Sequence, residues 1–347
     1  MDRENGKVLL QPSGQELVPR QGQSILDAAL EAGVNLPRSC QGGLCGACSA
    51  LLLEGQVSYP EGRPMGLSEE DEREGKVLLC MARPLGRVRV EAIPVTRAGQ
   101  AEVKRLPCRV QSLSMLCHDV MRLELRLPAV EPLEFEPGQY VDLMLSGGRR
   151  RSFSIAGHSE DGRVIELHVR RVSGGEFTGQ VFDEIRPGSV LRLEGPFGSF
   201  TLQQSSRPWL MLAGGTGLAP IKSMLDRALQ QGERRAIRLF WGVRDQQDLY
   251  AVEILTDYTQ KFEDFRWTPV LSEAGQAWSG LTGLVHEAAI SNTPDLWAYD
   301  IYAAGPPGLV AAVRKVFPDA GANPAAIFCD SFDYSPDSRG PVPGDSV

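Results

Sequence analysis

The chain has 347 residues, enough for two or three domains, and its 42% hydrophobic and 23% charged composition is ordinary for a soluble globular protein. A net charge of −8 argues against nucleic-acid binding. The chain has no run of 18 apolar residues, and its polar N-terminus lacks the apolar core of a secretory signal, so we expect no membrane segment and a cytoplasmic location.

Residues 1–98 predict a small mixed α+β fold. The expected strands are short apolar or alternating runs, at residues 7–11, 16–19, 51–53, 56–59, 77–79 and 88–90. Ser24 has the residue type of a helix N-cap and precedes a helix predicted over residues 25–32. Glu54-Gly55 is expected to turn a hairpin. An acid-rich helix is expected to start at Ser68, and we interpret its charges as a solvated face, with docking of a partner protein as the alternative.

Four cysteines in this segment have the spacing of an iron–sulfur ligand set. Cys40, Cys45, Cys48 and Cys80 form C-x4-C-x2-C followed by 31 residues and the fourth cysteine, the plant-type arrangement for a 2Fe-2S cluster. Glycines around the first three let the backbone wrap closely and aim N–H groups at sulfur. A zinc site or disulfides are the alternatives. Zinc sites favour paired C-x2-C knuckles, of which only one is present, and disulfides need an oxidising compartment.

After a linker at about 94–103, residues 99–204 predict an antiparallel barrel. The expected strands alternate in hydrophobicity and are separated by turns, at residues 108–115, 121–127, 140–145, 152–156, 164–171 and 190–194. One helix is expected, at 177–185, because Pro187 and Gly188 end the pattern there.

The barrel segment contains a strand whose side chains suit a flavin. In Arg151-Ser152-Phe153-Ser154, the arginine offers a planar group of donors to phosphate, the aromatic ring can pack against the flat flavin, and a hydroxyl can reach ring nitrogen N5. This tetrapeptide alone is a weak signal. Its neighbours strengthen it: Tyr140 upstream, His168-Val169-Arg170 downstream, and Gly174-Gly175 with Thr178 at a helix start, where N–H groups favour phosphate.

Residues 205–334 alternate strands with helices, which predicts a parallel sheet. Strands are expected at 209–212, 236–241, 265–271, 300–304 and 326–329, and helices at 218–230 and 308–317. Gly214-Gly215-Thr216-Gly217 lies between a strand and a helix, where a dinucleotide phosphate binds, although it is not the G-x-G-x-x-G fingerprint. Gly305-Pro306-Pro307 predicts a rigid turn at another strand exit. Residues 335–347 are predicted to be a disordered tail.

The choice between NADH and NADPH is read after the second strand of this segment. A 2′-phosphate needs two or more basic groups, but Arg244 is accompanied by Asp245 and Asp248. The third strand is followed by Glu273, which adds negative charge. The charge pattern therefore favours NADH.

These motifs resemble two families joined in one chain, over residues of about 5–334. The first segment is similar to plant-type ferredoxins, which implies a β-grasp fold. The remainder resembles the ferredoxin-NADP reductase family, with its motifs R-x-[YF]-[ST], G-G-x-x-[ST] and G-G-T-G-[LI]-[AT]-P. The resemblance implies FAD rather than FMN. It places Arg151, Gly175 and Thr178 at the FAD pyrophosphate, Phe153 against the flavin and Ser154 at N5. Phe332, two residues after Asp330, would cover the flavin ring.

The full set of predicted site residues combines the pattern and the resemblance. The residues are Cys40, Cys45, Cys48 and Cys80 for the cluster; Tyr140, Arg151, Ser152, Phe153, Ser154, His168, Val169, Arg170, Gly174, Gly175 and Thr178 for FAD; and Gly215, Thr216, Gly217, Arg244, Gly305 and Pro306 for NADH, with Ser154 and Phe332 in catalytic roles. Four positions depart from the commoner family residues: Phe153 replaces tyrosine, Thr178 replaces serine, Asp330 replaces glutamate, and Ala304 stands where a cysteine often precedes Gly-Pro-Pro. Cys108, Cys117 and Cys329 are expected to be buried thiols.

In this order of segments, the protein resembles the reductase components of bacterial ring-hydroxylating dioxygenases and soluble di-iron monooxygenases. The resemblance implies that electrons pass from NADH through FAD and the 2Fe-2S cluster to a separate oxygenase or carrier protein. One alternative is the same relay serving a sugar-nucleotide dehydrase. A second is a non-catalytic scaffold, which the intact cysteine, flavin and nicotinamide motifs disfavour.

Overall fold

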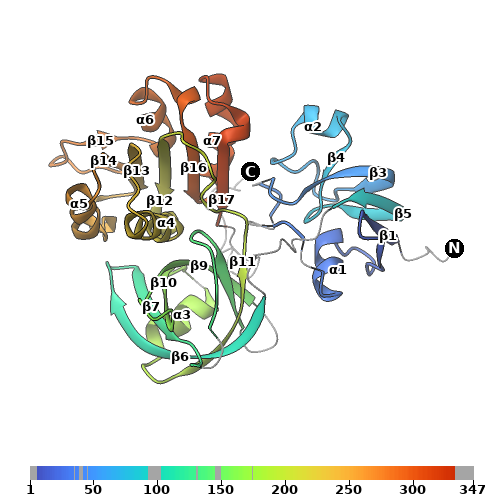
Figure 1. The fold of residues 1–347 in the computed structure, drawn as a ribbon, viewed down its shortest axis with the longest axis horizontal. Coiled ribbons are helices and arrows are strands. Elements are labelled where there is room, and N and C mark those ends of the chain that lie inside the picture. Colours follow the sequence, from blue (N-terminus) through green and yellow to red (C-terminus); the bar gives the residue numbers. More distant parts are fainter. Residues whose placement is uncertain are drawn as a thin grey trace, which may run out of the picture. The chain divides into compact units, whose positions relative to one another are not determined.

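The computed structural model describes residues 6–34, 36–38, 42–44, 46–92, 103–129, 132–144, 150–173 and 175–332. The chain divides into two compact units, residues 1–100 and 101–347 (Figure 1). One apolar cluster fills the first unit and three fill the second. None of the described helices is long and apolar enough to cross a membrane. The predicted tail at 335–347, and the predicted linker except for Val103, lie outside the described residues.

The first unit is a five-stranded mixed sheet with the order β2-β1-β5-β3-β4. β1 and β5 pair in parallel and the other neighbours are antiparallel, which is the predicted β-grasp arrangement. The strands are β1 (Lys7–Gln11), β2 (Gln15–Leu17), β3 (Ser49–Ser58), β4 (Lys76–Leu78) and β5 (Arg83–Glu91). The helices are α1 (Ile25–Glu31) and α2 (Glu69–Arg73), whose N-termini are capped by Ser24 and Ser68.

The predicted hairpin at Glu54-Gly55 is wrong, because β3 continues through these residues. Its pairing with β5 shifts register on either side of Glu54. Gly55 has φ +89, and a Cβ there would lie 2.3 Å from the Arg87 carbonyl oxygen. The glycine therefore permits a bulge where the two strands approach closely. The partner strand β5 is correspondingly longer than the predicted strand at 88–90.

The first part of the second unit is the predicted antiparallel barrel, closed in the order β10-β7-β6-β11-β8-β9. Alternate residues of its strands, such as Ile165, Leu167 and Val169, are fully buried in the barrel core. The elements are β6 (Lys104–Met115), β7 (Val120–Arg126), β8 (Tyr140–Met144), β9 (Arg150–His158), β10 (Val164–Arg170), α3 (Glu176–Asp183) and β11 (Val190–Phe197).

The second part is the predicted parallel sheet, with six strands in the order β15-β14-β13-β12-β16-β17. The strands are β12 (Trp209–Gly214), β13 (Ile237–Val243), β14 (Phe265–Leu271), β15 (Leu281–Thr282), β16 (Asp300–Gly305) and β17 (Ile327–Ser331). The helices are α4 (Leu218–Gln230), α5 (Val252–Lys261), α6 (Val285–Ser291) and α7 (Pro307–Asp319). The strand β15 and the helices α5 and α6 are not predicted by the sequence pattern. Helices α5 and α6 each bury only two residues, so their apolar stripes are narrow.

The strand order of this sheet positions the nicotinamide site. β13 and β14 extend from one side of β12, whereas β16 and β17 extend from the other. The order in which strands are added therefore reverses at β12, and because β12 and β16 are parallel neighbours, the loops that follow these two strands lie beside each other. In open parallel sheets, ligands bind at such a switch point.

Candidate cofactor-binding and electron-transfer sites

The predicted cluster ligands join two distant parts of the first unit. Cys48 lies just before β3 and Cys80 lies shortly after β4, and both are buried. The Leu79 amide donates a hydrogen bond of 3.1 Å to the Cys48 carbonyl oxygen, so the backbone holds the two segments together. Cys40 and Cys45 lie outside the described residues.

Glycines near these cysteines form a cradle without room for side chains. A Cβ at Gly43, which has φ +76, would lie 2.7 Å from Met81 Cγ, and one at Gly66 would lie 2.6 Å from the Leu44 carbonyl oxygen. The Gly66 amide donates to the Gly43 carbonyl oxygen at 2.8 Å, which ties a second loop to the cluster loop. Such close backbone approach suits thiolate-held sulfide, so the residues present fit a 2Fe-2S cluster.

Tyr59 supports the segment that carries Cys80. Its hydroxyl accepts a hydrogen bond of 3.2 Å from the Leu78 amide. Burial raises the pKa of Tyr59, and the nearby Cys48 and Cys80 act in the same direction. The phenol therefore lies within electrostatic reach of both cysteines and stays protonated at neutral pH.

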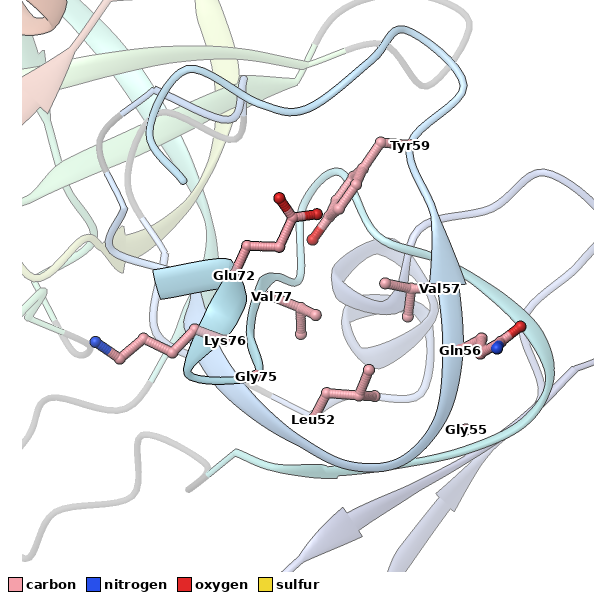
Figure 2. Close-up of a pocket in the computed structure, with 9 residues that line it drawn as sticks. All are labelled: Leu52, Gly55, Gln56, Val57, Tyr59, Glu72, Gly75, Lys76 and Val77. Atoms are coloured by element: carbon pink, nitrogen blue, oxygen red, sulfur yellow. The ribbon is translucent and has the colours of Figure 1, made fainter. Parts of the chain in front are cut away.

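A pocket of about 260 Å³ lies beside Tyr59 in the first unit. Figure 2 shows Leu52, Val57 and Val77 turned toward its interior, whereas Lys76 extends away from it. Lys76 forms ion pairs with Asp71 at 2.8 Å and with Glu74. The pocket floor is thus apolar, and the charge of Lys76 at its rim is paired with acidic residues outside the pocket.

Strands β8 and β9 bring several predicted flavin residues together. They pair with Tyr140 opposite Ser154 and Asp142 opposite Ser152. Ser152 Oγ donates to Asp142 Oδ1 at 2.6 Å, so this hydroxyl is engaged within the barrel. Tyr140 is buried, and its ring centroid lies 5.7 Å from that of Phe197.

Phe153 and Ser154 point to opposite faces of β9. Phe153 is partly buried against the barrel core, with its ring centroid 5.4 Å from that of Phe177 in α3. Ser154 Oγ donates to Asp330 Oδ2 at 3.4 Å. Ser154 lies on β9 of the barrel, which carries the predicted flavin residues and is called the flavin strand below, and Asp330 lies on β17 of the parallel sheet. Their contact therefore joins the flavin strand to the sheet that carries the predicted nicotinamide loops. The amide of Phe332 donates to the Gly305 carbonyl oxygen at 2.8 Å, which places this residue at the same end of the sheet.

The predicted phosphate end of the flavin site is the start of α3. Gly175 is its N-cap and supplies no capping side chain, so the helix N-terminus suits an anion. The Thr178 hydroxyl accepts from the Val172 amide at 3.1 Å and donates to the Gly175 carbonyl oxygen at 3.2 Å, which shapes the loop before the helix. Arg151 donates to the Arg150 carbonyl oxygen at 2.8 Å. Gly174 lies outside the described residues.

The two predicted nicotinamide loops pack against each other. A Cβ at Gly217 would lie 2.0 Å from the Ala304 carbonyl oxygen, and one at Gly305 would lie 2.9 Å from the Gly214 carbonyl oxygen. Trp241 of β13 donates a hydrogen bond of 2.9 Å from Nε1 to the Gly215 carbonyl oxygen, which ties the glycine loop to the neighbouring strand. Gly215 and Thr216 form a single helical turn that leads into α4, and Pro306 is the N-cap of α7. This glycine cradle beside a helix start fits a dinucleotide phosphate.

Neighbouring side chains in the segment 168–170 face different parts of the second unit. Val169 faces the barrel core, whereas His168 faces the parallel sheet. His168 Nε2 lies 2.7 Å from Glu166 Oε1, and Nδ1 lies 3.2 Å from Tyr250 Oη. The ring therefore connects β10 to the segment before α5, and its predicted contact with FAD remains a prediction.

Buried charges accompany His168 at this contact. Burial lowers the pKa of His168, so the ring is neutral at physiological pH. Burial alone would raise the pKa of Glu166, but the hydrogen bond with His168 and the charge of Lys222 outweigh it and lower the pKa to about 2. Lys222 of α4 also donates to the Ala156 carbonyl oxygen at 3.2 Å and to Asp226 at 3.0 Å.

Arg170 and Arg244 form one ion-pair network with two aspartates. Asp119, in the turn between β6 and β7, accepts from Arg170 Nε at 2.8 Å and from Arg244 Nη2 at 3.2 Å. Asp248 accepts from Arg170 Nη2 at 3.2 Å and from Arg244 Nε at 3.3 Å. His118 adds a contact of 3.7 Å to Asp248.

Among the described residues, Cys117, His118, Asp119 and Asp248 place potential metal-ligand atoms within 4.8 Å of one another. Both carboxylates are already neutralised by Arg170 and Arg244, so a cation would have to displace two guanidinium groups. Burial raises the pKa of the Cys117 thiol, which opposes the thiolate form that metals bind. The cluster is therefore an ion-pair network rather than a metal centre. Cys108 and Cys329 are buried, as expected, and burial raises the pKa of Cys108 to about 12. The same prediction is wrong for Cys117, which is only partly buried because it lies in the turn between β6 and β7.

Sequence reasoning missed the residues that connect the barrel to the sheet. Asp119, Glu166, Lys222 and Tyr250 meet partners that are distant in the chain, so no local motif reveals them. Lys222 had a signal, because it is a lone charge within an apolar stretch of a predicted helix. A buried lysine needs a partner, and Glu166 and Asp226 supply it.

Comparisons with known proteins agree with this architecture. Sequence models match in series: the 2Fe-2S iron-sulfur cluster binding domain over residues 8–85, the oxidoreductase FAD-binding domain over 107–202 and the oxidoreductase NAD-binding domain over 211–315. The CDP-6-deoxy-L-threo-D-glycero-4-hexulose-3-dehydrase reductase of Yersinia pestis is 34% identical, over 94% of this chain and 98% of its own. Reductase component 1 of terephthalate 1,2-dioxygenase from Comamonas sp. is 35% identical, over 91% and 94%.

A solved structure extends the likeness to three dimensions. The crystal structure of the Amycolatopsis cytochrome P450 reductase GcoB matches with a TM-score of 0.74 and 32% identity, over 94% of this chain and 98% of that one. With these identities over nearly complete chains, the protein belongs to the family of iron–sulfur flavoprotein reductases, which carry 2Fe-2S, FAD-binding and NAD-binding domains in one chain. It is an oxidoreductase, and the scaffold alternative is no longer needed.

Proposed function

We propose that this protein is the NADH-dependent reductase component of an oxygenase system and that it delivers electrons to a separate oxygenase or carrier protein. The observation that carries the proposal is the contact of Ser154 with Asp330, which brings the flavin strand to the strand end beside the nicotinamide loops. The dioxygenase reductase from Comamonas sp., similar over 91% of this chain, supports an oxygenase as the acceptor.

The chain's own residues hold and orient the cofactors. FAD, when bound, supplies the conversion of a two-electron hydride donor into single electrons, which are what a 2Fe-2S cluster accepts. Arg151 and the start of α3 are proposed to bind the FAD pyrophosphate, and Ser154 to orient the flavin at N5. The cysteine tetrad is proposed to hold the cluster, and it belongs to a unit that folds separately from the FAD-binding and NAD-binding parts. Four ligand thiolates need a reducing compartment, which supports a cytoplasmic location.

A second acceptor is supported by a specific relative. The Yersinia pestis protein, named as a dehydrase reductase, is 34% identical to this chain over 325 residues. Its name describes a reductase for a CDP-hexulose dehydrase, and the similarity covers 94% of this chain and 98% of that protein. The acceptor distinguishes the two functions, because the electron donor and cofactors are the same in both.

The test is to identify the native acceptor. The tagged holoprotein is purified from the cells that produce it, and proteins that co-purify are identified and then assayed for reduction by NADH through this reductase. An oxygenase or an oxygenase carrier protein is the expected partner. A sugar-nucleotide dehydrase that accepts the electrons would establish the alternative and overturn the oxygenase assignment.

A further inference from the structure

The ion-pair network around Arg244 lies where the adenosine end of a dinucleotide is recognised. Arg244 directly follows β13, and the end of β13 pairs with the end of β12, where the glycine loop begins. In sheets of this kind, the residues after the second strand contact the ribose of the adenosine, and a basic residue there accommodates a 2′-phosphate. Arg244 is therefore the residue that would be expected to favour NADPH.

Arg244 is not available for that role, because two carboxylates hold it. Its Nη2 donates to Asp119 at 3.2 Å and its Nε donates to Asp248 at 3.3 Å. Asp248 is only 1% exposed and also accepts from the Arg244 amide at 3.2 Å, so this aspartate is fixed in the connection that follows β13. Asp119 comes from the flavin barrel and completes the neutralisation from the other side.

The segments that follow β13 and β14 offer no replacement for the neutralised cation. Residues 243–249 contain Arg244 as their only lysine or arginine, and residues 271–274 contain Glu273 but no basic residue. Burial alone would raise the pKa of Asp119, but the hydrogen bond and charge of Arg170 lower it below its ordinary value. Asp119 is therefore ionised at neutral pH, and a 2′-phosphate would meet a carboxylate at close range.

We propose that Asp119, a residue of the flavin barrel, makes the nicotinamide site selective for NADH by holding Arg244 away from a 2′-phosphate. This proposal rests on the proposed use of NADH and adds the residue that enforces it. Asp119 is a positioning residue: it acts through Arg244, which has to leave the carboxylate before it can pair with phosphate. A dinucleotide with a free 2′-hydroxyl makes no such demand and leaves the network intact.

The test uses a pair of ligands that differ only in the 2′-phosphate. Adenosine 2′,5′-bisphosphate and adenosine 5′-monophosphate are titrated into the oxidised holoprotein, and their dissociation constants are measured by calorimetry. Asp119→Asn should tighten binding of the bisphosphate by about tenfold and leave the monophosphate unchanged. The double variant Asp119→Asn/Arg244→Gln should lose this gain. Asp183→Asn, which breaks the exposed pair with Arg171, is the matched control and should change neither ligand.

A second arm does not depend on the stability of the Asp119 variant. Arg244→Gln in the otherwise native protein should alter bisphosphate affinity by less than about threefold, because the arginine is already neutralised. A loss of tenfold or more would show that Arg244 binds the 2′-phosphate in the native protein and would overturn the proposal. An unchanged ligand ratio in a correctly folded Asp119→Asn protein, or a gain that survives in the double variant, would overturn it as well.

The proposal and the proposed function fail in different ways. If the native protein has a higher kcat/KM for NADPH than for NADH, the proposed electron donor is wrong. If the native protein prefers NADH but the Asp119→Asn variant keeps the native ratio of ligand affinities, only the role of Asp119 is wrong.

Discussion

Gly217 shows how strictly a single position is constrained in the dinucleotide loop. Its Cα approaches the Ala304 carbonyl region so closely that a Cβ would lie 2.0 Å from that oxygen. The obstacle is backbone of β16, which cannot move aside as a flexible side chain would. The same contact sets the spacing between the two nicotinamide loops, so a displacement of one loop would also displace the other.

We therefore expect Gly217→Ala to weaken both the fold and dinucleotide binding. Backbone overlap of this kind costs about 1–3 kcal/mol of unfolding free energy, and the displaced loop should weaken NADH binding by about tenfold or more. Denaturant unfolding and NADH titration measure the two effects. Gly275→Ala is the control, because a Cβ there meets no atom within 4 Å. Native behaviour of the Gly217 variant would show that the two loops are not in contact.

Substitution of Arg151 tests the predicted binding site for the FAD pyrophosphate. Arg151→Ala should yield protein that is purified with little FAD, because the remaining donors are the amides at the start of α3. The ratio of flavin to protein absorbance measures this directly. Arg186→Ala, at an exposed arginine beyond α3, is the control. Normal flavin occupancy in the Arg151 variant would remove it from the FAD site.

At the scale of elements, the contact between β10 and α4 depends on charge. Glu166 has a pKa lowered from 4.5 to about 2, so it favours the folded state by up to about 3 kcal/mol at neutral pH. Because the folded pKa is depressed, this contribution is complete above pH 4.5 and is lost as the pH falls toward 2. His168 acts in the same direction, since its lowered pKa removes stability as the pH falls below its ordinary value of 6.5.

Glu166→Gln should therefore lower the unfolding free energy of the second unit by up to about 3 kcal/mol at pH 7, and the difference from the native protein should shrink below pH 4.5. All five tryptophans lie between residues 209 and 297, so tryptophan fluorescence reports this unit alone. Glu160→Gln, at an exposed turn residue, is the control. A difference that stays constant down to pH 3 would exclude the proposed linkage.

The predicted elements agree best with the structure where the hydrophobic pattern of a segment matches the burial of that segment in the fold. The barrel strands alternate, and the parallel strands are apolar runs, so both sheets were recognised. The predicted turn at Gly55 is wrong because a glycine after a polar residue is equally compatible with a turn and with a bulge. Asp248, four residues after Arg244, is visible in the sequence as a neighbouring charge. Asp119 could not be predicted as a partner of Arg244, because it lies 125 residues away and belongs to a different part of the fold.

At the scale of the whole molecule, the residues predicted to bind FAD and NADH and the residues predicted to bind the cluster belong to different units. The second unit contains both the flavin strand and the nicotinamide loops, whereas the predicted cluster ligands belong to the first unit. Cys45→Ser should therefore abolish electron delivery to one-electron protein acceptors while NADH still bleaches the flavin absorbance. Cys108→Ser, at a buried barrel cysteine, is the comparison and should keep both activities. Loss of flavin bleaching in the Cys45 variant would contradict the separation.

The passage of electrons from the nicotinamide donor to iron is the most direct test. Holoprotein is mixed rapidly with NADH without oxygen, frozen at successive times, and examined by electron paramagnetic resonance. The signal of a reduced 2Fe-2S cluster should follow the bleaching of the flavin and be absent from the Cys45→Ser protein. If the flavin bleaches but the native protein never gives the iron signal, the cluster does not receive the electrons and the assignment is wrong.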